Sequence, residues 1–264
     1  MRLRRFAVAA LLLCVSARVL RAGAAEVPGL RIAAASDLQA ALPSLVRAFE
    51  RETGRSVTVS FGSSGNFFSQ IQNGAPFDVF LSADIDYPKQ LESARLAEPG
   101  TLYPYATGSI VLWTRRGSGV DVQKGLETLS SAGIRRIAIA NPEHAPYGRA
   151  AVAALRAVGL YDQLRAKLVL GENVSQAAQF VQSGNADAGI IPLSLARSAG
   201  LSTVGQYADI PASLYPPIEQ AAVIVRASRH KDTARAFLAY LKRVDVMKAL
   251  ADAGFGPPLA RTSR

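Results

Sequence analysis

The stretch SFGSSGNFFSQIQNGAPFDVFLSAD, residues 60–84, joins two strand-like segments through a short helix-like segment. The β-branched run 56–61 alternates as a strand does, and residues 67–73 follow a helical pattern that Gly74 closes. The run FDVFLSA (77–83) is typical of a buried strand. A strand, a helix and a second strand in this order predict a parallel sheet with the helix packed on it.

The segment before this stretch repeats the strand-to-helix pattern. LRIAAA (30–35) reads as a buried strand, and the apolar residues after it recur at helical spacing through about Glu52. Pro43 falls inside this pattern, and a proline interrupts the hydrogen bonds of a helix interior. We therefore expect either a separate first turn before Pro43 or a helix that is kinked there.

Strand and helix patterns alternate over the rest of the chain. Strand–helix units cover 135–160 and, twice more, 167–200, and further strand-like runs lie at 106–116 and 219–227. One or two helices then end the chain. This alternation predicts an α/β fold with mainly parallel sheets and helices on both faces. The units fall into two sets, before and after about residue 105, although the pattern alone does not distinguish one domain from two.

Residues 1–24 have the features of a secretory signal peptide. Three arginines lie within the first five residues, an apolar run follows over 6–17, and the small residues 22–24 fit a cleavage site. A membrane anchor is the alternative, but this apolar run is shorter than the roughly 20 residues that span a bilayer. We therefore expect export to the periplasm and removal of the leader.

The chain that remains after this cleavage has no cysteine and a modest positive charge. Cys14 is the only cysteine of the 264 residues, so we expect neither a disulfide nor thiol chemistry. The formal charge falls from +10 to +5 with the five arginines of the leader. Lys and Arg do not gather in a stripe with interleaved aromatic residues, which excludes nucleic acid as a partner.

Four strand-to-helix junctions place small or polar residues at the start of a helix. The first N–H groups of a helix have no partner inside it, and the helix dipole leaves partial positive charge there. Because such ends lie at the carboxyl edge of the strands, several of them together can hold an oxyanion without any formal positive charge. The junctions are Ser36-Asp37, Ser63-Ser64-Gly65-Asn66, Tyr147-Gly148-Arg149 and Asn173-Val174-Ser175.

Each junction also has a plainer explanation. Ser, Asp and Asn are common first residues of helices because their side chains cap the free N–H groups. The spacing alone leaves both interpretations open, four separate helix caps and one shared anion site.

Four blocks of the sequence resemble the periplasmic molybdate-binding protein family, the substrate-binding proteins of molybdate ABC transporters. The resemblance runs in order over nearly the whole chain after the leader. The blocks are AAASDLQAALPSLVRAFERETG, VSFGSSGNFFSQIQNGAPFDVFLSAD, IANPEHAPYGRAAVAAL and LGENVSQAAQFVQSGNADAGI.

The resemblance implies a type II periplasmic-binding-protein fold, with two α/β lobes around a ligand cleft. It implies that residues 25–105 and 218–264 form lobe 1 and that 106–217 form lobe 2, because the family's chain crosses between the lobes twice. It also implies a binding protein without catalytic activity or cofactor, which takes molybdate, and tungstate too, to a membrane permease. We expect it to be a monomer.

The resemblance also implies which residues bind the anion. Ser36 and Ser64 would donate their hydroxyl and N–H groups from one lobe, and Tyr147 and Val174 their N–H groups from the other. Asp37, next to Ser36, would add its N–H while its carboxylate points away from the anion.

The sequence departs from the family pattern at one position. Some members have a tyrosine after the GII-type strand, where its hydroxyl reaches the anion, but here that position is Pro192. Those members often have a small residue where this chain has Tyr147. Our hypothesis is that the hydroxyl of Tyr147 supplies the missing contact.

Two other functions start from the same residues. A serine hydrolase that uses Ser64 needs a base, and the chain has only His144 and His230. We expect His144 to be a hydrogen-bonding loop residue at the rim of the cleft. The same fold could also hold sulfate, phosphate or a small organic acid. Phosphate carries a proton that a site made only of donors cannot accept.

Charged residues near the junctions have two interpretations each. Asp78, Asp84 and Asp86 could form a carboxylate cluster for metal binding or acid–base chemistry, but capping and turn roles explain them better. Arg149 could reach an anion or form a salt bridge at the cleft rim.

Overall fold

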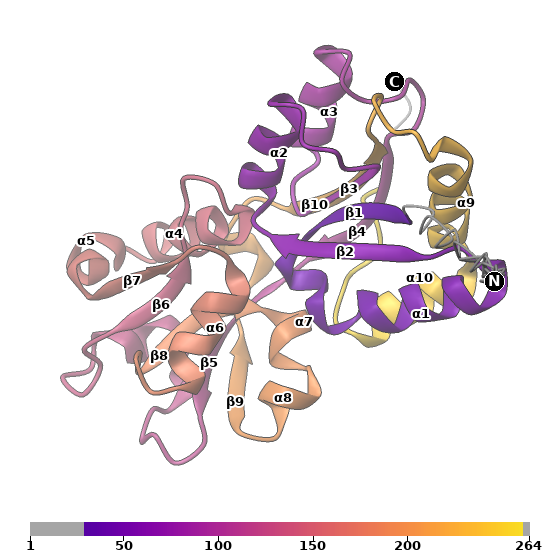
Figure 1. Ribbon diagram of the computed structural model, residues 1–264. Coiled ribbons are helices and arrows are strands. Elements are labelled where there is room, and N and C mark those ends of the chain that lie inside the picture. The colour runs from indigo at the N-terminus through magenta and orange to yellow at the C-terminus, as the bar shows by residue number, and fades with distance from the viewer. Residues whose placement is uncertain (1–28, 261–264) are drawn as a thin grey trace, which may run out of the picture.

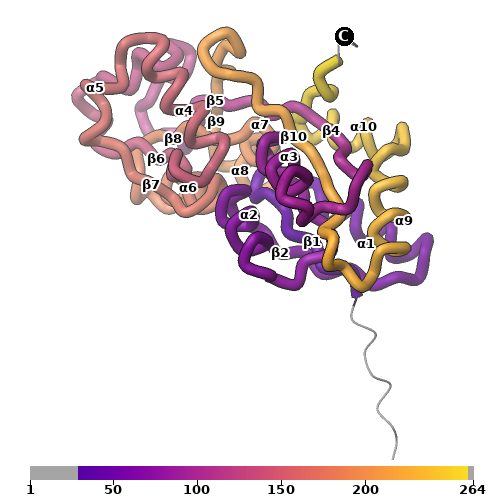
Figure 2. The backbone as a smooth tube through the Cα atoms, turned by 90° about the horizontal axis from the view of Figure 1, so that it is seen from above, coloured from indigo at the N-terminus to yellow at the C-terminus, as the bar shows by residue number. Residues whose placement is uncertain are grey.

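The computed structural model describes residues 29–260 and arranges them in two lobes, each built around a five-stranded sheet. The first and last parts of the described chain form one lobe, and the middle part forms the other (Figures 1 and 2). The two-lobed α/β architecture is therefore as expected. The expected signal peptide, 1–24, and Cys14 within it lie outside the described residues.

The first lobe has a mixed sheet with the strand order β2-β1-β3-β10-β4. β1 pairs parallel with β2 and β3, whereas β10 pairs antiparallel with β3 and β4 because it returns from the other lobe. The elements of this lobe are β1 (Leu30–Ala35), η1 (Ser36–Ala40), α1 (Leu42–Thr53), β2 (Val57–Gly62), α2 (Ser64–Gln72), β3 (Val79–Ser82), α3 (Asp86–Ser93), β4 (Tyr103–Gly108), β10 (Ile218–Ile224), α9 (Lys231–Leu241) and α10 (Val244–Asp252).

The second lobe repeats this plan with the strand order β7-β6-β8-β5-β9. β6 pairs parallel with β7 and β8, and β5 pairs antiparallel with β8 and β9. The elements are β5 (Ile110–Arg115), η2 (Val122–Ser130), β6 (Ile137–Ala140), α4 (Pro146–Ala157), α5 (Tyr161–Leu164), η3 (Arg165–Lys167), β7 (Leu168–Gly171), α6 (Val174–Gln182), β8 (Ala188–Pro192), α7 (Leu193–Ala196), α8 (Ala199–Ser202), β9 (Gly205–Asp209) and η4 (Ala212–Leu214).

The chain passes between the two sheets at Ser109 and again before β10. β4 ends at Gly108 and β5 begins at Ile110, so the boundary expected at residue 105 falls inside β4. The run 106–116, which reads as one strand, belongs to two strands in different sheets. The only local sign of this crossing is the pair of small residues Gly108 and Ser109, because no proline or charged residue interrupts the run 106–114.

The central strands are buried on both faces, which explains their continuous apolar sequences. All four residues of β3 and all four of β6 are buried. In the first lobe the rings of Phe49 on α1 and Phe237 on α9 meet edge to face, with centroids 5.2 Å apart. In the second lobe Trp113 on β5 is fully buried. Each lobe therefore has its own core, and the cleft between them is free to serve binding.

The segment after β1 begins with a 3-10 turn. This turn, η1, ends at Ala40, and α1 begins at Leu42 with Pro43 in its first turn. A proline is tolerated there because its missing N–H would have no partner in the helix anyway. The separate first turn is therefore the correct one of the two alternatives. It places Ser36 and Asp37 at the carboxyl end of β1, where both are buried.

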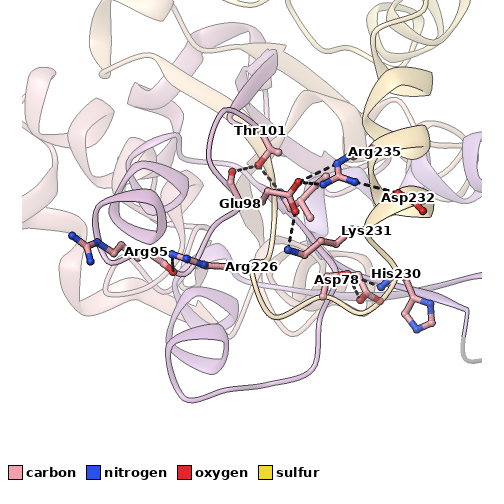
Figure 3. A network of polar contacts seen from close by, with 11 residues as sticks. Asp78, Arg95, Glu98, Thr101, Arg226, His230, Lys231, Asp232 and Arg235 are labelled. Atoms are coloured by element: carbon pink, nitrogen blue, oxygen red, sulfur yellow. Dashed lines mark hydrogen bonds and ion pairs between the residues drawn. The ribbon is translucent and has the colours of Figure 1, made fainter.

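The opposite end of the first sheet is held by charged groups (Figure 3). Glu98 pairs with Lys231 of α9 at 3.2 Å and with Arg235 of the same helix. Asp78 accepts hydrogen bonds of 2.7 Å from the N–H of Arg31 and from the hydroxyl of Ser228. Asp78 therefore ties the start of β3 to β1 and to the segment after β10, and not to a helix start or a turn as we expected. Within the described residues, no helix combines the length and hydropathy needed to cross a bilayer.

Candidate functional site

The four strand-to-helix junctions meet at one small pocket between the lobes. β1 and β2 bring their carboxyl ends from the first lobe, and the starts of α4 and α6 come from the second. The described residues that line the pocket are Ala35, Ser36, Asp37, Gly62, Ser63, Ser64, Ala83, Ala145, Pro146, Tyr147, Asn173 and Val174. All five residues expected to bind an anion are among them.

The first lobe contributes two serine hydroxyls. The Oγ of Ser64 accepts a 2.9 Å hydrogen bond from the N–H of Ala83, so its own proton is left to donate to a ligand. The Oγ of Ser36 lies 3.2 Å from the carbonyl of Gly62 and can rotate toward the pocket. Both residues are buried, with 1% and 2% of their surface exposed, so a ligand that meets them is shielded from water.

The second lobe contributes helix starts. Pro146 occupies the first turn of α4 with Tyr147 next to it, and Asn173 caps α6 by accepting the N–H groups of Ser175 and Gln176 at 3.0 and 3.1 Å. Among the described residues, none accepts a hydrogen bond from the N–H of Tyr147 or Val174. These two N–H groups are therefore the free donors of their helices.

The Tyr147 hydroxyl is hydrogen-bonded within the protein. It donates a 2.8 Å hydrogen bond to the carboxylate of Asp37 and accepts one of 2.9 Å from the amide of Gln220. Burial raises the pKa of Tyr147 well above its usual value, so the phenol stays protonated and acts as a donor. The side chain of Tyr147 thus links the two lobes, while its backbone N–H has no acceptor among the described residues.

Asp37 is the acidic residue of the pocket lining, and it is fully buried. Its Oδ2 accepts the hydroxyl of Tyr147 and, at 2.5 Å, the amide of Gln220. Burial raises the pKa of the carboxyl to about 6, although these two hydrogen bonds oppose the effect. Asp37 therefore brings a carboxyl group beside the donors expected in this pocket.

The rim of the pocket joins the lobes through His144. Its Nδ1 lies 2.9 Å from the hydroxyl of Ser63, and its carbonyl accepts the N–H of Gly65 at 2.9 Å. His144 is thus the hydrogen-bonding rim residue that we expected. For the residues that the structure describes, the hydrogen bond at the Oγ of Ser64 comes from Ala83, and no histidine contacts that oxygen.

Two further contacts cross the rim. Arg149 of α4 forms a salt bridge with Asp84 and a 3.2 Å hydrogen bond with the hydroxyl of Tyr87. Asp84 also accepts the N–H of Asp86 at 2.8 Å, which is a turn role, and Asp86 pairs with Lys89. Within residues 29–260, no three His, Cys, Asp or Glu side chains are grouped to hold a metal ion.

The other edge of the cleft is joined by uncharged and acidic side chains. Asn66 of α2 donates to Glu172, and Ser175 of α6 donates to Gln39. Together with His144 these contacts encircle the pocket. The structure is therefore that of the closed form, in which both lobes enclose the same small volume.

The chain matches the model of the bacterial extracellular solute-binding protein family over residues 30–256. The chain belongs to this family. It is 38% identical over 251 residues to the molybdate-binding protein ModA of Azotobacter vinelandii, which covers 95% of this chain and 98% of that protein. It is 30% identical over 259 residues to ModA of Escherichia coli (strain K12), which covers 96% and 97%.

A solved structure supports the same relationship. The periplasmic molybdate-binding protein of Azotobacter vinelandii superposes with a TM-score of 0.82 at 37% identity, covering 87% of this chain and 100% of that chain. The resemblance to the periplasmic molybdate-binding protein family is therefore confirmed, and so is the two-lobed periplasmic-binding fold.

Sequence reasoning missed one important member of the site. Gln220 lies on β10, far along the chain from the four junctions, yet it contacts both Asp37 and Tyr147. Its only signal was a polar residue at the start of an otherwise apolar run, EQAAVIV. The hydroxyl of Tyr105 holds the Gln220 amide in place at 2.7 Å.

Proposed function

We propose that this protein binds molybdate, and tungstate too, in the pocket between its lobes and delivers it to a membrane ABC permease. The ligand is a cargo, and neither a cofactor nor a catalytic step is part of the proposal. The proposal rests on Ser36, Ser64, Tyr147 and Val174 as hydroxyl and N–H donors, with the N–H of Asp37 beside them.

The observation that carries the proposal is a pocket of neutral donors supplied by both lobes. None of the described residues that line it is Lys, Arg or His. A buried oxyanion is held in such a place by helix starts and hydroxyls. Molybdate-binding relatives at 38% and 30% identity over nearly the full chain support the choice of anion.

The number of donors is sufficient for tight binding. A hydrogen bond to a charged group contributes ~1.5–3 kcal/mol, and micromolar affinity requires ~8 kcal/mol. The five donors named above together contribute ~7.5–15 kcal/mol, which meets this requirement over most of that range. The pocket also selects by size, because donors placed for a large tetrahedral anion make long, weak bonds to sulfate.

Delivery requires that the bound form differ from the free form. The donors of one lobe meet those of the other only when the lobes are closed, so the ligand favours the closed form by the contacts that it makes to both. We propose that a monomer in the periplasm, freed of residues 1–24, presents this closed form to the permease.

Other ligands and one enzymatic function remain as alternatives. The carboxylate of Asp37 could accept the proton of hydrogen phosphate, so phosphate belongs among the candidates together with sulfate and a small organic acid. A serine hydrolase would need a base at Ser64, and the hydrogen bond of that oxygen comes from the Ala83 N–H.

A panel of thermal-shift measurements tests the proposal. The protein without its leader is heated with molybdate, tungstate, sulfate, phosphate or citrate at equal concentrations. We expect a rise in melting temperature with molybdate and tungstate only, because ligand that binds the folded state alone stabilises it. A rise with sulfate, phosphate or citrate of the same size would contradict the proposal.

A further inference from the structure

Asp37 is the acidic side chain of the pocket lining, and we propose that it takes up one proton when the lobes close on the oxyanion. This inference rests on the proposed function, because the bound dianion supplies the charge that the proton offsets. The proton comes from solvent and forms a bond to a carboxylate oxygen of Asp37. The closed pocket then gains one negative charge rather than two.

The position of Asp37 makes its charge difficult to keep in the closed form. The residue is fully buried, and it lies beside Ser36 in the lining that also includes Ser64, Tyr147 and Val174. A dianion held by these donors is therefore enclosed with the carboxylate. Two like charges that share a buried site favour protonation of one of them.

The side chains that donate hydrogen bonds to this carboxylate come from β10 of the first lobe and α4 of the second, and both are neutral. The hydroxyl of Tyr147 and the amide of Gln220 donate to Oδ2 at 2.8 and 2.5 Å. Tyr105 of β4 donates a hydrogen bond of 2.7 Å to Gln220, and Tyr215 contributes to the raised pKa of Tyr147. Both phenols are buried, and neither brings a positive charge.

The helices of the second lobe that pack on η1 bring hydroxyls to it. Ser194 of α7 donates to the carbonyl of Asp37 at 2.8 Å, and Ser175 of α6 lies 3.4 Å from the carbonyl of Ser36. The titratable groups of the rim are engaged elsewhere, His144 with Ser63 and Arg149 with Asp84. No cation among the described residues contacts Asp37 to keep it ionised.

The structure also indicates which oxygen receives the proton. Oδ2 already accepts two hydrogen bonds, whereas Oδ1 is buried and has no hydrogen-bond partner among the described residues. A proton on Oδ1 converts this unsatisfied acceptor into a donor. The protonated side chain therefore suits an anion site, and the ionised one does not.

Closure changes the surroundings of Asp37 in the direction that favours the proton. Separating the lobes moves Tyr147 away and lets water reach the carboxylate, which returns its pKa toward the usual value for Asp. In the closed form burial raises the pKa to about 6, against the hydrogen bonds from Gln220, Tyr147 and the backbone N–H groups of Asp37 and Leu38 that lower it, before the charge of any dianion is added. A proton is therefore bound more tightly in the closed complex than in the open protein.

Isothermal titration calorimetry with sodium molybdate tests this inference. At about pH 7.5, in buffers with different ionisation enthalpies, the slope of the observed heat against buffer enthalpy counts the protons taken up. We expect about one proton per anion for the wild type and about none for Asp37→Asn. The control Asp209→Asn, an exposed residue on β9, should keep the wild-type value.

The pH dependence of the affinity gives a second readout. Uptake of one proton predicts about a tenfold loss of affinity per pH unit above neutrality for the wild type. Asp37→Asn should show a flat profile, and any slope that this variant retains measures protonation of the ion itself.

Each of three results would contradict either the proton-uptake inference or the proposed function. Proton uptake near zero in the wild type contradicts the inference. This result needs no variant, so the test remains decisive even if Asp37→Asn folds poorly. Equal uptake in the wild type and Asp37→Asn assigns the proton to another group and also contradicts it. Absence of molybdate binding by the wild type at every pH contradicts the proposed function instead.

Discussion

The N–H of Gly65, on α2 of the first lobe, donates a 2.9 Å hydrogen bond to the carbonyl of His144 in the second lobe. The two backbones can approach this closely because residue 65 has no side chain. A Cβ on Gly65 would lie 2.7 Å from that carbonyl and 2.8 Å from the hydroxyl of Tyr87. The backbone contact therefore belongs to the closed form, whereas the hydroxyl of Tyr87, on α3 of the same lobe, is the end of a side chain that can turn aside.

Gly65→Ala should therefore weaken ligand binding without destabilising the free protein. Alanine favours a helix over glycine by ~1 kcal/mol, so the melting temperature without ligand should stay equal or rise. The affinity for molybdate should fall about tenfold or more, because a backbone carbonyl cannot move aside easily. Gly200→Ala is the matched control, since a Cβ at that helical glycine meets nothing within 4 Å. Equal affinities for the two variants would contradict the explanation.

Ser64→Ala should remove one donor from the bound anion. The Ala83 N–H already occupies an acceptor position of the hydroxyl, so the hydroxyl proton is the group that the ligand loses. We expect the affinity to fall about 10- to 100-fold, which corresponds to a charge-assisted hydrogen bond of ~1.5–3 kcal/mol. Calorimetry with Ser69→Ala, an exposed serine on the same helix, provides the baseline. A loss of less than about threefold would remove Ser64 from the site.

Tyr147→Phe separates the two roles of this residue. The backbone N–H remains in the pocket, whereas the hydrogen bond to Asp37 that joins the lobes is lost. We expect about a fivefold loss of affinity, from one neutral hydrogen bond of ~1 kcal/mol, and a larger radius of gyration with subsaturating ligand. Tyr161→Phe in the second lobe is the control. A loss of affinity above about 100-fold would instead indicate that the hydroxyl contacts the anion directly.

Asp37→Asn should stabilise the closed protein, measured with saturating molybdate, at neutral pH. The pKa of Asp37 in the folded state, about 6, lies above its usual value of 3.8, so the folded state binds the proton more tightly than the unfolded state. Stability from this group is therefore full below about pH 4 and is lost as the pH rises through about 6. We expect the melting temperature of the variant to exceed that of the wild type by a few degrees at about pH 8, and by less at about pH 5. If the melting temperatures of the variant and the wild type differ equally at both pH values, the raised pKa of Asp37 is contradicted.

The repeated strand–helix pattern predicts an α/β fold, whereas the two lobes and the shared anion site were implied by the family resemblance, because the helix starts alone left separate caps as an alternative. Ser36 and Ser64 are local signals, because a small polar residue follows an apolar strand, whereas Tyr147 and Val174 were implied by the resemblance. The antiparallel entry of the last strand of the first lobe could not be predicted in this way. Its direction depends on the return from the other lobe, which no local pattern records.

The side-chain contacts across the cleft could not be predicted from the sequence for a similar reason. Nothing near Tyr147 in the chain indicates that its hydroxyl meets Asp37 and Gln220, which are 110 and 73 residues away. Our hypothesis for this hydroxyl followed from Pro192, a position where a donor is missing. The structure satisfies the hydroxyl within the protein, because a buried phenol needs a partner whether or not a ligand is present.

The most direct test is a crystal structure of the protein grown with molybdate, with anomalous diffraction measured at the molybdenum absorption edge. We predict one strong anomalous peak between the lobes, with oxygens at hydrogen-bond distance, ~2.7–3.2 Å, from the hydroxyls of Ser36 and Ser64 and the N–H groups of Tyr147 and Val174. A peak elsewhere on the molecule, or a closed pocket from which molybdenum is absent at saturating concentration, would contradict the account.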